Sequence, residues 1–129
     1  MNKIVLGLLL LSSTLFSVEW VKDIDTALTL AKKEHKNVMV LVEGENCRWC
    51  KKMKYRTLSD ESVEKRLEKF VAVKVMREDS SAMSVLPQVK GVPTIFFMNE
   101  NKSVLKEIVG YLDVEDFISY INDVEKNKK

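Results

Sequence analysis

Short runs of apolar, often β-branched residues alternate along this chain with stretches in which apolar residues recur every three or four positions. The apolar runs are residues 38–42, 71–76 and 95–98, and helical spacing covers residues 23–36, 47–58, 59–70 and 113–121. An unbroken apolar run flanked by helices is typical of a strand that is buried on both faces of a sheet. The pattern therefore predicts an α/β domain, and the apolar face of its third helix is expected to comprise Val63, Leu67 and Phe70.

The end of the chain adds an antiparallel element. A polar turn at residues 99–102 separates the strand at 95–98 from a further strand at 103–109, which predicts a hairpin. Strands that are separated by helices require right-handed parallel crossovers. We therefore expect a mixed sheet of four strands with helices on both faces.

Residues 1–17 form a separate segment. Lys3 is followed by eight residues rich in leucine and then by small polar residues, which is the layout of a secretory signal peptide. The apolar run is shorter than the roughly 20 residues that cross a bilayer. We expect cleavage after Ser17, although Leu15 is larger than is usual there, and the alternative is an uncleaved anchor. Residues 18–129 would then form one exported domain without stable membrane insertion.

Composition narrows the function classes. The chain of 129 residues carries 21 basic and 19 acidic residues, so its net charge of +2 produces no strong field. A chain with so little excess charge is not expected to bind nucleic acid. Its length allows one domain with a full hydrophobic core.

The two cysteines, Cys47 and Cys50, form a Cys-x-x-Cys motif between an apolar run and a helical pattern. Such a pair can be a zinc site, a structural disulfide, a relic in a redox-inactive binding module, or a catalytic dithiol. A structural zinc ion needs four ligands, and His35 is the single histidine. A disulfide that closes so short a loop contributes only about 2 kcal/mol of stability. We therefore favour the catalytic dithiol, with no metal and no cofactor.

Position assigns roles within this pair. The N-terminus of a helix favours a thiolate, so Cys47 is the expected nucleophile and Cys50, one turn further in, the buried resolving thiol. Arg48 and Lys51 should favour the thiolate further, whereas Glu43 should oppose it. The balance of these charges is not determined by the sequence.

Together with Gly91-Val92-Pro93-Thr94 before a strand, these features resemble the thioredoxin superfamily. The resemblance covers almost the whole mature chain, from about residue 18 to residue 124. The resemblance implies the thioredoxin fold and a cis peptide bond before Pro93, beside the cysteines. The backbone of Val92 would then be free to pair with an extended substrate segment. The alternative is an ordinary trans proline at the start of an edge strand.

Three positions depart from thioredoxin itself. Arg48 and Trp49 replace the Gly-Pro between its cysteines, and Leu41 occupies the position of its buried aspartate. Glu43, two residues along the same strand, is the candidate replacement for that aspartate. Trp49 is expected either to stack against substrate or to cover the disulfide.

The resemblance to exported, thioredoxin-related bacterial proteins implies a periplasmic thiol:disulfide oxidoreductase. We expect the reducing direction, because strong periplasmic oxidases carry a large helical insertion and isomerases an added dimerisation domain. The expected partners are protein or small-molecule disulfides and an upstream electron donor, for which a membrane thiol-reducing protein is one candidate. We expect a monomer. The alternative is a redox-inactive peptide-binding or partner-binding module of the same fold.

Overall fold

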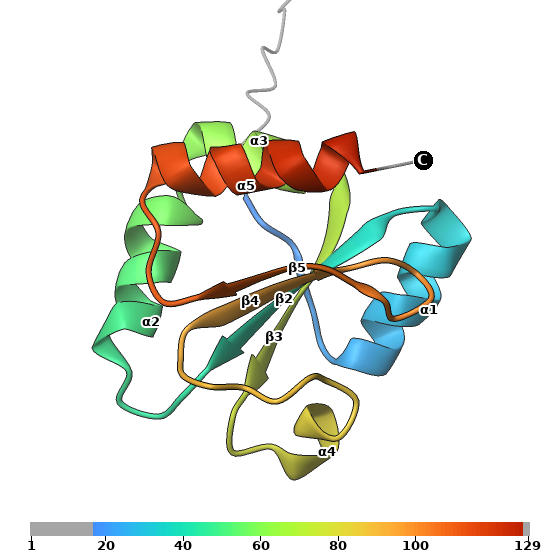
Figure 1. Cartoon of the computed structure of the whole chain (residues 1–129), viewed down its shortest axis with the longest axis horizontal. Coiled ribbons are helices and arrows are strands. Elements are labelled where there is room, and N and C mark those ends of the chain that lie inside the picture. Colours follow the sequence, from blue (N-terminus) through green and yellow to red (C-terminus); the bar gives the residue numbers. More distant parts are fainter. Residues whose placement is uncertain (1–16, 128–129) are drawn as a thin grey trace, which may run out of the picture.

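The computed structural model describes residues 17–127, which form a central sheet with helices on both faces (Figure 1). The strands are β1 (Trp20–Val21), β2 (Asn37–Glu43), β3 (Phe70–Met76), β4 (Thr94–Met98) and β5 (Val104–Val109). The helices are α1 (Ile24–Glu34), α2 (Arg48–Lys52), the π-helical segment η1 (Met53–Thr57), α3 (Glu61–Leu67), α4 (Ser80–Met83) and α5 (Val114–Lys126). Among these described residues, no helix combines the length and the apolar character that crossing a bilayer requires.

The strands lie in the order β1-β3-β2-β4-β5. Strand β3 is parallel to both β1 and β2, whereas β4 is antiparallel to β2 and to β5. The predicted α/β thioredoxin fold with its closing hairpin is confirmed, and the mixed sheet has five strands instead of the expected four. The additional strand, β1, is two residues long and pairs only with β3, so it leaves no periodic signal in the sequence.

Side chains of the central strand alternate between two cores. All of β2 is buried: Val38, Val40 and Val42 pack with α1 on one face, and Met39 and Leu41 face the other core. The second core is covered by η1, α3 and α5, and in Figure 1 these helices lie across the sheet from α1 and α4. The prediction that this strand is buried on both faces is confirmed.

Two local predictions need correction. Phe70 does not belong to the face of the third helix, because α3 ends at Leu67 and Phe70 begins β3, opposite Asn37 of β2. Its ring packs against Phe97 with centroids 5.2 Å apart, so tertiary packing decides its element. The helix expected over residues 47–58 is also not uniform.

That helix changes form after α2. It widens into η1, in which the Leu58 N–H donates to the Met53 carbonyl at 2.9 Å. Met53 and Thr57 are fully buried there, and the Thr57 hydroxyl donates to the Leu112 carbonyl at 2.6 Å. This bond ties the segment that follows the cysteines to the loop between β5 and α5.

Candidate active site

Cys47 and Cys50 are joined in a disulfide where the chain passes from β2 into α2, with Cα atoms 5.2 Å apart. The turn is made by residues 44–47, and Asn46 adopts a positive φ of 51°, a conformation that asparagine tolerates better than most residues. Cys47 is the N-cap of α2, and its Sγ accepts a hydrogen bond from the Cys50 N–H at 3.1 Å. Cys47 is partly exposed and Cys50 is only 1% exposed, so the cysteines differ in access as expected from their positions.

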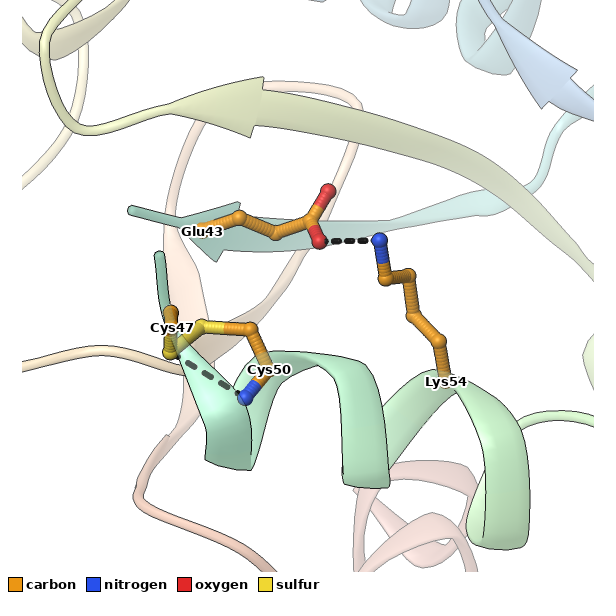
Figure 2. A network of polar contacts seen from close by, with 4 residues as sticks. All are labelled: Glu43, Cys47, Cys50 and Lys54. Carbon is orange, nitrogen blue, oxygen red and sulfur yellow. Dashed lines mark hydrogen bonds and ion pairs between the residues drawn. A yellow bond between two sulfur atoms is a disulfide. The ribbon is translucent and has the colours of Figure 1, made fainter. Parts of the chain in front are cut away.

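Glu43 is the last residue of β2 and is buried. It lies on the same face of the sheet as Leu41, two residues earlier, which is fully buried in the core. Figure 2 shows its carboxylate turned toward Lys54, whose Nζ lies 2.5 Å from Glu43 Oε1. Glu43 is among the residues predicted from the sequence and Lys54 is not, although a residue four positions after Cys50 lies one helical turn along the same face.

The predicted residues Val92 and Pro93 approach the same turn from the loop before β4. The Val92–Pro93 peptide bond is cis, Pro93 is buried, and Val92 is partly exposed. A β-carbon on Gly44 would lie 3.0 Å from Val92 Cγ2, so the loop packs directly on the turn that leads to Cys47. The Pro93 carbonyl accepts a hydrogen bond from the Gly110 N–H at 2.8 Å, which fixes the loop to the end of β5.

Trp49 is 46% exposed and packs against Tyr111, with ring centroids 5.8 Å apart. The Lys52 ammonium lies 4.7 Å from the centre of the Trp49 ring and 4.8 Å from that of Tyr111. The Arg48 guanidinium lies 5.5 Å from the Trp49 ring. Tyr111 and Lys52 are not among the residues predicted from the sequence, and Tyr111 carries no signal because it lies 61 positions after Cys50, in the loop that follows β5.

Acidic groups lie on the other side of the turn. Glu45 is exposed, and its backbone N–H donates to the Glu78 carboxylate at 3.2 Å. This hydrogen bond holds the pKa of Glu78 below its usual 4.5, so that carboxylate is charged at neutral pH. In the part of the chain that the structure describes, no three His, Cys, Asp or Glu side chains gather where they could hold a metal ion.

Comparisons with known proteins agree with this geometry. A family model for a thioredoxin-like domain matches residues 24–125. Anterior gradient protein 3 of Xenopus tropicalis is 30% identical over 94 residues, which are 72% of this chain and 57% of that protein. The chain thus spans little more than half the length of the curated relatives that it matches.

Two solved structures illustrate the structural likeness. A thioredoxin from Thermus thermophilus aligns with a TM-score of 0.71 and 26% identity, covering 84% of this chain and 87% of that one. The C-terminal domain of DsbD from Neisseria meningitidis, in its oxidised form, aligns with a TM-score of 0.64 and 24% identity, covering 81% and 92% of the two chains. The latter likeness concerns the fold alone.

The family match extends from the start of α1 almost to the end of α5, so it includes the disulfide, the buried Glu43 and the Pro93 loop. The protein has the strand order, the Cys-x-x-Cys disulfide and the helical layers described above. On this evidence the chain belongs to the thioredoxin-like domain family.

Proposed function

We propose that this protein is an exported thiol:disulfide oxidoreductase that uses Cys47 and Cys50 in the reducing direction. The observation that carries the proposal is the difference in access across the disulfide, because Cys47 is partly exposed and Cys50 is buried. A sulfur from another molecule can therefore reach Cys47 but not Cys50. This asymmetry is what a two-step exchange through a mixed disulfide requires.

In the reduced protein, the Cys47 thiolate attacks one sulfur of the substrate disulfide, and the other substrate sulfur leaves as a thiolate. The Cys50 thiolate then attacks the Cys47 sulfur and releases the second substrate thiolate. Two electrons pass to the substrate, two protons neutralise the released thiolates, and the Cys47–Cys50 disulfide forms. The Cys50 N–H already points at Cys47 Sγ, where it would stabilise negative charge on that sulfur.

We assign to Glu43 the role of accepting the proton from the Cys50 thiol. The carboxylate is buried at the end of β2, and its partner Lys54 lies one helical turn beyond Cys50. A buried carboxylate that a lysine holds in place can accept the proton of a thiol, and burial keeps that proton from passing to solvent. Glu43 would thus serve in place of the aspartate that thioredoxin has at the position of Leu41.

The link between β3 and β4 supports the reducing direction. It holds only the four-residue helix α4, so it carries no large helical insertion of the kind found in strong oxidases. The predicted signal peptide at residues 1–17 supports export to a periplasm, although almost all of it lies outside the described residues. The partners would be disulfide substrates and an upstream electron donor, and the enzyme would act as a monomer.

Trapping in extracts tests the activity. Cys50→Ser should accumulate mixed disulfides through Cys47, because the resolving thiol is absent, and Cys47→Ser is the matched control. Equal capture by the two variants would contradict the proposal. Partner binding that persists in Cys47→Ser, with no insulin reduction by the native protein, would indicate a redox-inactive binding module.

Direction is tested separately by titration of the disulfide against glutathione. The family spans roughly −270 to −120 mV, and we expect a potential nearer the lower end. A potential near about −120 mV would indicate an oxidase instead.

A further inference from the structure

The helical segment that follows Cys47 is strongly basic. Residues 48–57 contain five basic side chains and no acidic one, although the whole chain has a net charge of only +2. The basic residues are Arg48, Lys51, Lys52, Lys54 and Arg56. Of these, only Lys54 forms an ion pair within residues 17–127, and its partner is Glu43. The other four cations are therefore not neutralised by a neighbouring carboxylate.

Two of these cations are held by aromatic rings instead. The Lys52 ammonium contacts both rings, 4.7 Å from the centre of Trp49 and 4.8 Å from that of Tyr111, and Arg48 lies over the Trp49 ring. A ring face attracts a cation but does not cancel its charge. The arrangement thus presents positive charge and half-exposed aromatic surface together, beside Cys47.

The loop that carries Tyr111 is fixed at both ends. The Gly110 N–H donates to the Pro93 carbonyl at 2.8 Å, and the Leu112 carbonyl accepts from the Thr57 hydroxyl at 2.6 Å. The aromatic pair therefore joins α2 to the loop after β5, and the hydrogen bond between Gly110 and Pro93 joins that loop to the loop before β4. A surface held in this way needs little ordering when a partner binds.

Among the acidic residues near Cys47, Glu45 is exposed on the other side of the turn, and two further carboxylates accept hydrogen bonds. Glu78 accepts the Glu45 N–H on the side of β3, and Asp113 caps α5 by accepting the Asp116 N–H at 2.9 Å. Neither forms an ion pair with the cations of α2 in the described part of the chain. The face of α2 around Cys47 therefore keeps an excess of positive charge.

We propose that Arg48, Trp49, Lys51, Lys52 and Tyr111 form a docking surface for a partner protein with acidic residues next to its reactive cysteine. This inference rests on the proposed function and specifies its substrate class. Carboxylates complement the unpaired cations, and an apolar side chain of the same segment can cover the Trp49 ring. A polypeptide is favoured over a membrane or a nucleic acid because the positive charge lies on α2 directly beside Cys47, and only a partner with a sulfur atom can react there.

The test uses two peptides that differ only in the residues flanking one cysteine, aspartate in one and lysine in the other. Each carries a disulfide to the same neutral small thiol. The pre-reduced protein is mixed with each peptide, and the released peptide thiol is measured after acid quench. The quantity of interest is the ratio of the two rates, because a change in the reactivity of Cys47 itself affects both rates alike.

We expect Lys52→Glu to lower the aspartate-to-lysine rate ratio about five-fold at an ionic strength of about 0.01 M, and we expect this difference to vanish at about 1 M. Lys51→Glu, at an exposed position, should act in the same direction. The control, Lys65→Glu on the exposed face of α3, makes the same change in net charge away from Cys47.

The outcomes separate the two proposals. An unchanged rate ratio in Lys52→Glu and Lys51→Glu, or an equal change in Lys65→Glu, would overturn the docking surface. Reaction of the same proteins with the neutral hydroxyethyl disulfide would still support the oxidoreductase. Absence of reaction with any disulfide would overturn both. A rate ratio near one, combined with binding to anionic phospholipid vesicles that Lys52→Glu abolishes, would assign the surface to a membrane instead.

Discussion

The ion pair between Glu43 and Lys54 makes a quantitative prediction about stability. The two charged atoms are 2.5 Å apart, and the Glu43 side chain is 11% exposed whereas that of Lys54 is 37% exposed. The Coulomb attraction at this separation is about 1.7 kcal/mol in bulk water and about 6.6 kcal/mol at an effective dielectric constant of about 20. Because the lysine is partly hydrated and dehydrating Glu43 is costly, we expect a net coupling of about 2 kcal/mol.

A double-mutant cycle with Lys54→Met and Glu43→Gln measures the coupling between the two side chains. Lys54→Met should lower the free energy of unfolding by about 3 kcal/mol, because it leaves a buried carboxylate without its cation. Glu43→Gln should cost only about 1 kcal/mol, since a neutral amide is less costly to bury than an unpaired carboxylate. The double variant should cost about 2 kcal/mol, which is less than the two single costs together.

Urea unfolding of the four proteins, with the disulfide kept oxidised, measures these free energies. Lys65→Met, at an exposed position on α3, is the control and should change stability by less than about 0.5 kcal/mol. If the two single-variant costs add to within about 0.5 kcal/mol, the predicted coupling is absent and the two charges do not stabilise each other.

Three further predictions concern the core, a helix cap and a turn. Phe97→Ala should lower the free energy of unfolding in urea by about 3–5 kcal/mol, because the ring is fully buried. The control Tyr55→Ala, at 83% exposure, should lower it by less than about 0.5 kcal/mol, and similar costs for the two variants would contradict the assigned burial. Asp60 caps α3, and its hydrogen bonds with Ser62 hold its pKa below the usual 3.8. Its contribution to the free energy of unfolding is therefore present above pH 3.8 and is lost as the pH falls through the lower pKa of the folded state. Asp60→Ala should therefore cost about 1 kcal/mol at neutral pH, and a difference from the native protein that did not shrink in acid would contradict this assignment. Gly110→Ala should lower the free energy of unfolding by about 1 kcal/mol, because the residue has a φ of +94° while no atom blocks a β-carbon, and unchanged stability would contradict that strain.

Much of the fold could be predicted because its signals are local. Asp23 and Asp113 each stand at the start of a helical pattern in the sequence, where aspartate is a favoured cap, and each accepts the N–H of the residue three positions on. Strand β2 was recognised from an unbroken apolar run, which the structure buries on both faces. These features depend on residues within one turn or one strand of each other, so periodicity and side-chain type suffice to find them.

The errors arose where an element depends on a distant partner. Strand β1 exists because Trp20 and Val21 pair with Ala72 and Val73, and two residues carry no period. Phe70 fits a helical spacing after Leu67, but its packing against Phe97 places it in β3. In both cases a long-range contact outweighed the local pattern.

The candidate active site likewise combines local features, which the sequence predicts, with long-range contacts, which it does not. Motif spacing and strand alternation are properties of the chain. They were enough to predict the Cys47–Cys50 pair at the start of a helix, the family resemblance through Pro93, and Glu43 as a carboxylate on the face of Leu41. Folding was needed to bring Lys54 to Glu43 and to bring Tyr111 against Trp49 and Lys52. These contacts join residues from different elements, so their geometry exists only after the sheet and helices have packed.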